Sequence, residues 1–277
     1  MSQNADSNVV AGFGDEWTRF DQAELPDADR DAIAADYFRI FPWTALPADA
    51  VGFDLGCGSG RWAAVVAPRV GTLHCIDASP EALAVARRNL AGRENVRFHV
   101  ASVDAMPLSE GTCDFGYSLG VLHHVPDTRA GILAAVRTLK PGAPLLLYLY
   151  YAFDNRPWWF RRVWQASEGA RFVVSRLPHG LRYAVSQLLA GVVYWPLARF
   201  ARGVEALGVD VGHFPLSAYR QRSFYVMRTD ALDRFGTRLE QRFSRTQIAA
   251  MMRDAGLRDI AFSDSTPYWC AVGFRAH

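Results

Sequence analysis

Paired cysteines, a strong net charge and a long apolar run are all missing from this chain of 277 residues. Its four cysteines form no C-x-x-C pair, so we expect buried reduced thiols in a cytoplasmic protein and no metal site. Lys and Arg number 30 against 28 Asp and Glu, and the basic residues form only short pairs such as Arg87-Arg88. Nucleic acid is therefore not an expected partner.

Two further absences concern membranes. The N-terminus lacks the basic start and apolar core of a signal peptide, so secretion is not expected. The longest apolar stretch, residues 184–200, is interrupted by polar residues and a proline and falls short of the roughly twenty apolar residues of a spanning helix. We favour a helix packed on the body of the protein, and one lying on a membrane surface stays open as the alternative.

Residues 51–151 alternate short apolar runs with stretches that have helical periodicity. The apolar runs are 51–54, 72–77, 96–100, 114–118 and 144–150. Such alternation predicts a parallel sheet with helices on both faces. After Tyr151 the pattern breaks into a stretch rich in Trp, Arg and helix formers, and two more strand-like runs follow at 259–262 and 269–274. We therefore predict a Rossmann-like, doubly wound, mostly parallel seven-stranded α/β sheet with a helical insertion after the fifth strand.

Three parts follow from this pattern. Residues 1–50 form an N-terminal helical segment, residues 51–151 and 229–277 form the sheet domain, and residues 152–228 form the insertion. The N-terminal segment is too short to be a domain of its own.

A glycine-rich turn follows the first apolar run. Asp54 precedes glycines at 56, 58 and 60. Because glycine has no Cβ, such a turn adopts positive φ and lets a ligand approach the backbone. The dinucleotide fingerprint has glycines at its first, third and sixth positions, and the sixth position here is Arg61, which argues against a dehydrogenase.

Two carboxylates follow the next two apolar runs. Asp77 would face the ribose of a nucleotide bound over the glycine turn, and Asp104 could accept the exocyclic amine of adenine. Either residue alone could equally be a helix cap or a turn former. Together with the glycine turn they mark one edge of the sheet, where open α/β sheets bind ligands.

These motifs together resemble class I methyltransferases of the type-11 group, which use S-adenosylmethionine. The resemblance is carried by Asp54 to Gly60, Asp77-Ala78, Val103-Asp104, the run from Cys113 to Val125 and Leu139 to Ala143. It implies that Asp54, Gly56, Gly58 and Gly60 hold the methionine part of the cofactor. It also implies that Asp77 and Ala78 contact the ribose, Val103 and Asp104 the adenine, and Leu119 and Gly120 the cofactor through their backbone.

His123 and His124 lie just beyond the fourth predicted strand, where an acceptor should enter. A hydroxyl acceptor needs a base, and histidine suits that task near neutral pH. Similarity to phosphobase methyltransferases implies that His123 is the catalytic residue. Capping of the next helix stays open for both histidines.

The insertion is expected to act as a substrate lid because aromatic and basic side chains gather in it. We predict that Tyr151, Arg156, Tyr219, Arg222 and Tyr225 contact the acceptor. The alternative is an ordinary helical pair with aromatic core residues and solvated arginines. Trp17 either folds over the cofactor or anchors the N-terminal segment.

The resulting hypothesis is methyl transfer from S-adenosylmethionine to O or N of a small molecule, namely a sugar, a glycan or lipid precursor, or a secondary metabolite. Carbon methylation of a lipid-like or quinone-like acceptor stays open. A nucleotide-cofactor oxidoreductase and a non-catalytic subunit that binds S-adenosylmethionine are rivals from other classes. The oligomeric state does not follow from the sequence.

Overall fold

The computed structural model describes residues 4–277, which divide into two compact units. The first unit comprises residues 1–23, 30–152 and 239–277, with its first three residues outside the described part. The second comprises residues 24–29 and 153–238.

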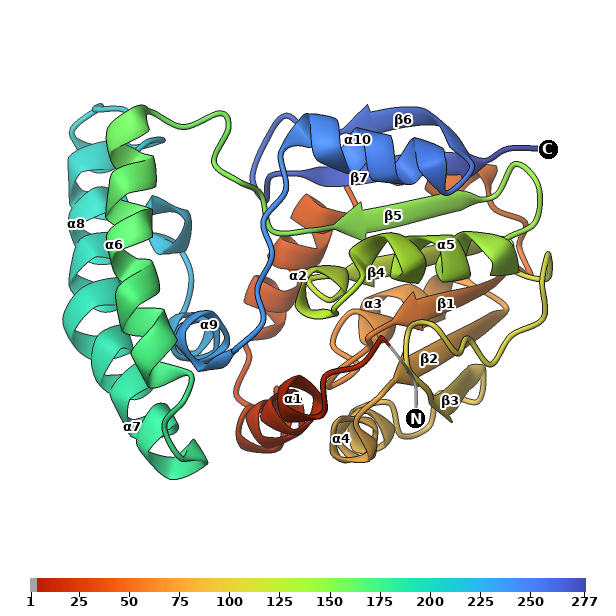
Figure 1. Ribbon diagram of the computed structural model, residues 1–277, viewed down its shortest axis with the longest axis horizontal. Coiled ribbons are helices and arrows are strands. Elements are labelled where there is room, and N and C mark those ends of the chain that lie inside the picture. Colours follow the sequence, from red (N-terminus) through yellow and green to blue (C-terminus); the bar gives the residue numbers. More distant parts are fainter. Residues whose placement is uncertain (1–3) are drawn as a thin grey trace. The chain divides into compact units, whose positions relative to one another are not determined.

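The first unit is built on a seven-stranded sheet (Figure 1). Its strands are β1 (Val51–Leu55), β2 (Thr72–Asp77), β3 (Val96–Val100), β4 (Phe115–Leu119), β5 (Pro144–Tyr148), β6 (Leu257–Phe262) and β7 (Cys270–Arg275). The spatial order is β3-β2-β1-β4-β5-β7-β6. The first five strands pair in parallel, whereas β7 runs antiparallel to both β5 and β6. The predicted mostly parallel, Rossmann-like sheet is confirmed.

Helices cover both faces of this sheet. They are α1 (Ser7–Arg19), α2 (Asp27–Tyr37), α3 (Ala63–Val66), α4 (Pro80–Asn89), α5 (Thr128–Thr138) and α10 (Arg245–Asp254). One core cluster joins α5 and α10 to the sheet through residues such as Ile132 and Ile248, and the other joins α3 and α4 to the opposite face through Val66 and Leu83. Apolar side chains on both faces of the central strands explain why these strands are nearly fully buried.

Side-chain caps fix where several of these helices begin. The Ser79 hydroxyl accepts the Ala82 amide at the start of α4, and Asp127 does the same for Ala130 in α5. Ser244 and Gln247 form a reciprocal capping box at α10, as the sequence suggests. The Ser79 cap places the end of β2 directly before the start of α4, whereas a 3-10 turn (Leu122–His124) lies between the end of β4 and the Asp127 cap of α5.

The second unit is helical. It contains α6 (Trp158–Val174), α7 (His179–Leu189), a π-helical turn (Ala190–Tyr194), α8 (Trp195–Ala206) and α9 (Phe224–Gly236). The helices α6, α7 and α8 surround a core that α9 completes with Met227, Ala231 and Phe235. For this reason the unit extends to Arg238, beyond the expected insertion boundary at residue 228. Across residues 4–277, each helix is too short or too polar to cross a membrane.

Candidate active site

The glycine turn after β1 has a backbone conformation and close contacts that exclude residues with a side chain at its three glycine positions. Gly56, Gly58 and Gly60 all have positive φ, at 79°, 53° and 77°. A Cβ at Gly56 would lie 2.4 Å from the Val121 side chain, and one at Gly60 would lie 2.9 Å from Leu90. The amides of Gly56 and Cys57 both donate to the Ile76 carbonyl, at 2.8 and 3.1 Å. The turn is therefore held against the end of β2.

Gly58 lies between two residues that the sequence assigns to the cofactor. Its amide donates to Asp77 Oδ2 at 2.8 Å. A Cβ at Gly58 would lie 2.8 Å from the indole of Trp17, which comes from α1, and the Arg61 guanidinium lies 5.4 Å from the Trp17 ring centre. Trp17 thus packs directly on the glycine turn. Whether it covers a bound cofactor or anchors α1 stays a prediction.

Asp77 is the acidic group that would meet a ribose. Its second oxygen accepts the Ser79 amide at 2.9 Å, so each carboxylate oxygen already accepts one backbone N–H. Burial raises the pKa of Asp77, and the amides of Ser79 and Gly58 oppose that rise. A carboxylate has about four lone-pair sites. The backbone amides of Ser79, Gly58 and Ala78 all act on this carboxylate, its contact with a ribose stays a prediction, and the helix-capping role belongs to Ser79.

Asp54 is buried at the end of β1, with 1% of its surface exposed. The Tyr117 hydroxyl on β4 donates to Asp54 Oδ2 at 3.0 Å. Burial raises the pKa of Asp54 from 3.8 to about 8, although this hydrogen bond acts in the opposite direction. A positively charged group placed beside Asp54 would favour its ionised form. Tyr117 was missed from the sequence, although its register position opposite Asp54 follows from pairing β1 with β4.

The raised pKa of Asp54 makes the stability of the fold depend on pH. Because its pKa is higher in the folded state than in the unfolded chain, its contribution to stability is complete below about pH 4 and is lost as pH rises toward 8. The slope is at most about 1.4 kcal/mol per pH unit. We expect Asp54→Asn to flatten this dependence, so that the ligand-free variant melts above the parent at pH 8. Calorimetric midpoints from pH 5 to 9 measure it, and parallel curves would contradict the buried, protonated carboxyl.

The expected adenine and backbone contacts lie at the ends of β3 and β4. Val103 is buried in the core, whereas Asp104 is exposed and accepts the Ser102 hydroxyl at 2.6 Å. Leu119 is buried, and Gly120 has a φ of 79° with open space where a Cβ would be. The Gly120 amide donates to the Tyr148 carbonyl at 3.0 Å. Their cofactor roles stay predictions.

His123 is fully buried in the short 3-10 turn Leu122–His124. The Tyr150 amide donates to His123 Nδ1 at 3.4 Å, and the two rings stack with centres 3.8 Å apart. Burial, His124 and the Arg242 guanidinium hold the pKa of His123 well below its usual range. The ring is therefore neutral, and because Nδ1 accepts, its proton lies on Nε2. That nitrogen has no hydrogen-bond partner among residues 4–277.

His124 has the opposite arrangement. Its Nδ1 lies 2.7 Å from the Leu239 carbonyl oxygen, which can only accept, so Nδ1 carries a proton. In the neutral ring the lone pair is consequently on Nε2. The Phe13 ring of α1 packs 5.0 Å away, between ring centres. His124 thus has the tautomer that a general base needs, whereas His123 has the tautomer of a donor.

A returning segment, residues 239–243, holds the two histidines in place and was missed from the sequence. The Gln241 amide donates to the His123 carbonyl at 3.0 Å, and Gln241 Nε2 donates to the Val125 carbonyl at 2.7 Å. Arg242 forms an ion pair with the buried Glu240 at 2.8 Å, and its guanidinium lies 4.9 Å from the Tyr150 ring centre. In the sequence, the charged residues Glu240 and Arg242 just before Ser244 are the feature that could have marked this segment. They place a fixed positive charge beside the histidine pair.

The five predicted substrate residues do not lie in one unit. Tyr151 belongs to the first unit, where its ring packs 5.7 Å from that of Tyr268. In the second unit, Arg156 donates to the Gly212 carbonyl, and Tyr219 packs against Tyr194 in the helical core. The carbonyl of Arg222 accepts from Arg199, and Tyr225 is buried on α9. Acceptor binding by these residues stays a prediction.

The first unit fits a nucleotide-containing cofactor with an amino-acid tail. The turn has positive-φ glycines, Asp77 accepts backbone amides beside it, and the buried Asp54 carboxyl lies at the end of β1 just before it. The Ser59 hydroxyl is buried within the turn and has no hydrogen-bond partner among the described residues. An orphaned polar atom in a buried turn is typical of a ligand site.

Comparison with known proteins decides which cofactor this is. Residues 53–147 match the family described as Methyltransferase domain. The chain is 30% identical over 179 residues to the ubiquinone biosynthesis O-methyltransferase of Xanthomonas oryzae pv. oryzae (strain PXO99A), covering 64% of this chain and 71% of that protein. The chain belongs to the class I S-adenosylmethionine-dependent methyltransferases. It is an enzyme that uses S-adenosylmethionine, which removes the oxidoreductase and non-catalytic rivals.

Solved structures of other methyltransferases share the fold. Phosphoethanolamine N-methyltransferase 2 of Haemonchus contortus, in complex with phosphomonomethylethanolamine and S-adenosylhomocysteine, aligns with a TM-score of 0.51 at 17% identity. The alignment covers 95% of this chain and 45% of that one. A methyltransferase from Methanosarcina mazei aligns with a TM-score of 0.51 at 16% identity, covering 84% of this chain and 95% of that one. At these identities the likeness concerns the fold alone.

Proposed function

We propose that this methyltransferase transfers the methyl group to an oxygen or nitrogen of a small acceptor molecule. One observation carries the proposal: a buried histidine pair, whose hydrogen-bond partners assign complementary tautomers, follows the residue that packs on the glycine turn. Val121, which directly precedes the histidine turn, packs on Gly56. An acceptor that has to lose a proton needs a base at this edge of the sheet, whereas an already ionised acceptor does not.

Each residue of the site has a separate task in this proposal. S-adenosylmethionine, when bound, supplies a methyl group that its sulfonium already activates. Asp77 and the glycine turn orient the cofactor, and Asp54 holds its cationic tail. His124 takes the proton of the acceptor hydroxyl or ammonium at Nε2. His123 offers its buried Nε2–H to the acceptor, and the Leu239 carbonyl fixes His124 in the base-competent tautomer.

The comparisons support a hydroxyl acceptor on a ring system as the first candidate. The Xanthomonas relative is named for O-methylation in ubiquinone biosynthesis. The two chains share 30% identity, so we infer a phenol-like or catechol-like hydroxyl and not a particular metabolite.

The test is transfer of labelled methyl from S-adenosylmethionine to matched acceptors. Catechols, primary amines and electron-rich rings without a hydroxyl would be offered separately, and mass spectrometry would locate the label. We expect label on oxygen or nitrogen. Label found only on ring carbon would contradict the proposal and support the carbon-methylation alternative.

A further inference from the structure

The second unit exposes an unusual amount of apolar surface. Among the described residues, the large apolar side chains that remain exposed lie in this unit, except for Val100 and Leu133. Trp158 is 72% exposed and Leu188 is 62% exposed. Scattered exposed apolar residues are normal, but contiguous patches mark interaction sites.

On α6 these residues follow a helical spacing. Trp159, Val163 and Val173 are four and ten residues apart, which places them on one side of the helix. Trp158 and Phe172, which directly precede Trp159 and Val173 in the sequence, are also exposed. We call this set the α6 outer face.

The continuous helix formed by α7, the π-helical turn and α8 carries a similar stripe. Leu181, Leu188, Val192 and Trp195 are exposed at intervals of seven, four and three residues. No charged residue occurs between Arg182 and Arg199. We call this stripe the α7–α8 outer face.

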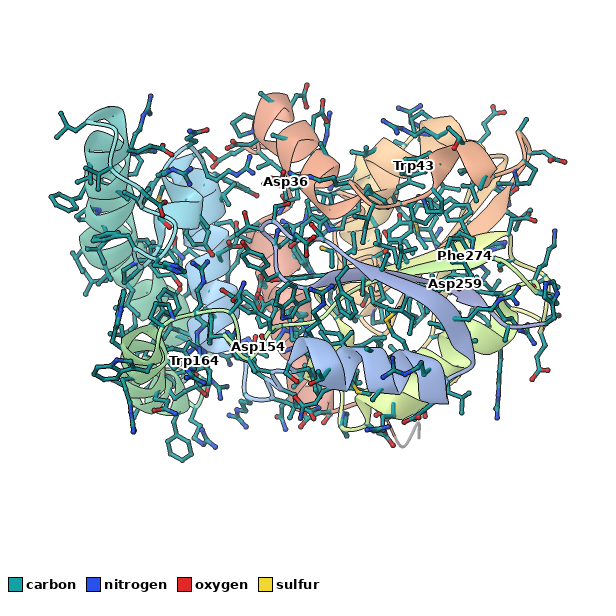
Figure 2. All side chains as sticks on the ribbon, turned by 90° about the horizontal axis from the view of Figure 1, so that it is seen from above. Asp36, Trp43, Asp154, Trp164, Asp259 and Phe274 are labelled. Carbon is teal, nitrogen blue, oxygen red and sulfur yellow. The ribbon has the colours of Figure 1, made fainter. Side chains whose placement is uncertain are left out.

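On the long helix the outer face is distinct from the face that builds the core, and on α6 the exposed Trp158 and Phe172 lie on the side opposite the core residue Val174. Val174 of α6 and Ala190, Tyr194 and Ala198 of the long helix pack with α9. Figure 1 shows α6 beside the α7–α8 helix, with α9 on one side of the pair. In Figure 2 side chains also project from α6, where Trp164 is labelled, and from α8. A helix that only packs on the core of a globular protein needs one apolar side, whereas α6 and the α7–α8 helix each have two.

Charge indicates what covers the outer faces. The second unit, residues 24–29 and 153–238, contains thirteen arginines, no lysine and nine acidic residues, a net charge of +4 in a chain whose total is +2. Two of the acidic residues are already in ion pairs, Glu168 with Arg171 and Glu205 with Arg220. Arg161 and Arg162 are exposed on α6, and Arg176 is exposed just beyond its C-terminal end. A second copy of the chain would bring the same positive charge, so the occupant is expected to be anionic.

The arginines are also placed directly on the exposed aromatics. The Arg176 guanidinium lies 3.6 Å from the Phe172 ring centre, and that of Arg199 lies 4.0 Å from Trp195. Apolar and aromatic side chains interleaved with arginine are the composition of segments that lie in a lipid interface. The apolar groups enter the acyl boundary there, and guanidiniums bind phosphate.

We propose that the α6 and α7–α8 outer faces dock this unit on an anionic phospholipid surface. The inference uses only residues of the second unit and does not depend on the identity of the methyl acceptor. It favours the membrane-surface alternative that the sequence left open for residues 184–200.

The experiment is co-sedimentation of the full chain with sucrose-loaded vesicles of phosphatidylcholine, with and without phosphatidylglycerol. We expect binding to the anionic vesicles at least about tenfold stronger than to neutral ones, and weaker binding as salt increases. Retention of the parent in the supernatant with anionic vesicles at low salt would overturn the proposal.

Two triple variants separate charge from apolar insertion. Arg161→Glu, Arg162→Glu and Arg176→Glu together should weaken binding by about 100-fold, since each basic residue at an anionic surface contributes about fivefold. Their matched control carries three charge reversals in the first unit. It consists of Arg88→Glu, Arg93→Glu and Arg253→Glu, all at exposed positions. The control should lose less than about threefold, because its changes lie outside the docking unit.

The second variant removes the exposed apolar groups, by Trp158→Ser, Val163→Ser and Phe172→Ser. It should lose at least about tenfold, because three apolar side chains that would enter the acyl boundary are removed. Val100→Ser with Leu133→Ser is its control. An unchanged S-adenosylhomocysteine-dependent rise in melting temperature verifies folding of each variant. Binding equal to that of the parent, or a dimer in sedimentation equilibrium that the variant dissociates, would overturn the lipid assignment.

Discussion

Replacing His124 by asparagine is expected to lower the rate of methyl transfer by about 10²- to 10⁴-fold, the usual contribution of a general base. An asparagine amide can still donate to the Leu239 carbonyl, as His124 Nδ1 does, but it has no counterpart of Nε2. The variant therefore keeps the structural hydrogen bond and loses the proton acceptor. Single-turnover transfer at saturating acceptor measures the chemical step.

His123→Asn is the matched comparison. Its side-chain oxygen can accept the Tyr150 amide, so the contact at Nδ1 is kept. We expect a loss of about 2- to 12-fold, the effect of one neutral hydrogen bond. Both variants should bind S-adenosylhomocysteine like the parent. A large loss for His123→Asn together with a small one for His124→Asn would reverse the two roles. The resemblance to phosphobase methyltransferases predicts that reversed outcome.

Gly58→Val is expected to weaken S-adenosylhomocysteine binding by on the order of 10- to 100-fold through overpacking of the turn. The new Cβ would lie 2.8 Å from Trp17, within the turn that we propose as the cofactor site. Isothermal calorimetry gives the affinity, and circular dichroism verifies the fold.

Gly92→Val controls for backbone strain. Gly92 has a φ of 83°, and no atom lies within 4 Å of the place a Cβ would occupy. This variant should lose stability but retain cofactor affinity. If both valine variants bound equally well, the glycine turn would not be the cofactor site.

The sheet and its binding edge were predictable because local signals there agree. Apolar runs of strand length alternate with helical periodicity, and strand ends are marked by Gly or Asp. Gly56, Gly58 and Gly60 all require positive φ, so their identities alone revealed the turn. Pro141-Gly142 similarly marked the end of α5.

Contacts between residues distant in sequence were not predictable. Asp54 and Tyr117 are 63 positions apart, and only strand pairing brings the hydroxyl to the carboxylate. The tautomers of His123 and His124 depend on Tyr150 and Leu239, which no local pattern connects with them. A histidine pair can be seen in the sequence, but the division of roles within it cannot.

The helical insertion shows a third limit of prediction from the sequence. Its helices are apolar on two sides, so periodicity does not distinguish the side that packs on α9 from the side that faces outward. Composition placed the end of the insertion at residue 228, where the stretch rich in Trp, Arg and helix formers ends, although α9 continues to Gly236 and belongs to this core.

The central claim is that Asp77 and the glycine turn of this methyltransferase hold S-adenosylmethionine. Calorimetric titration of the parent and of Asp77→Asn with S-adenosylhomocysteine tests it most directly, because asparagine retains one acceptor oxygen for the backbone but loses the charge-assisted contact to a pair of hydroxyls. We expect one site per chain in the parent and an affinity at least about tenfold lower in the variant. Absence of binding to the parent, or equal affinities, would contradict the account.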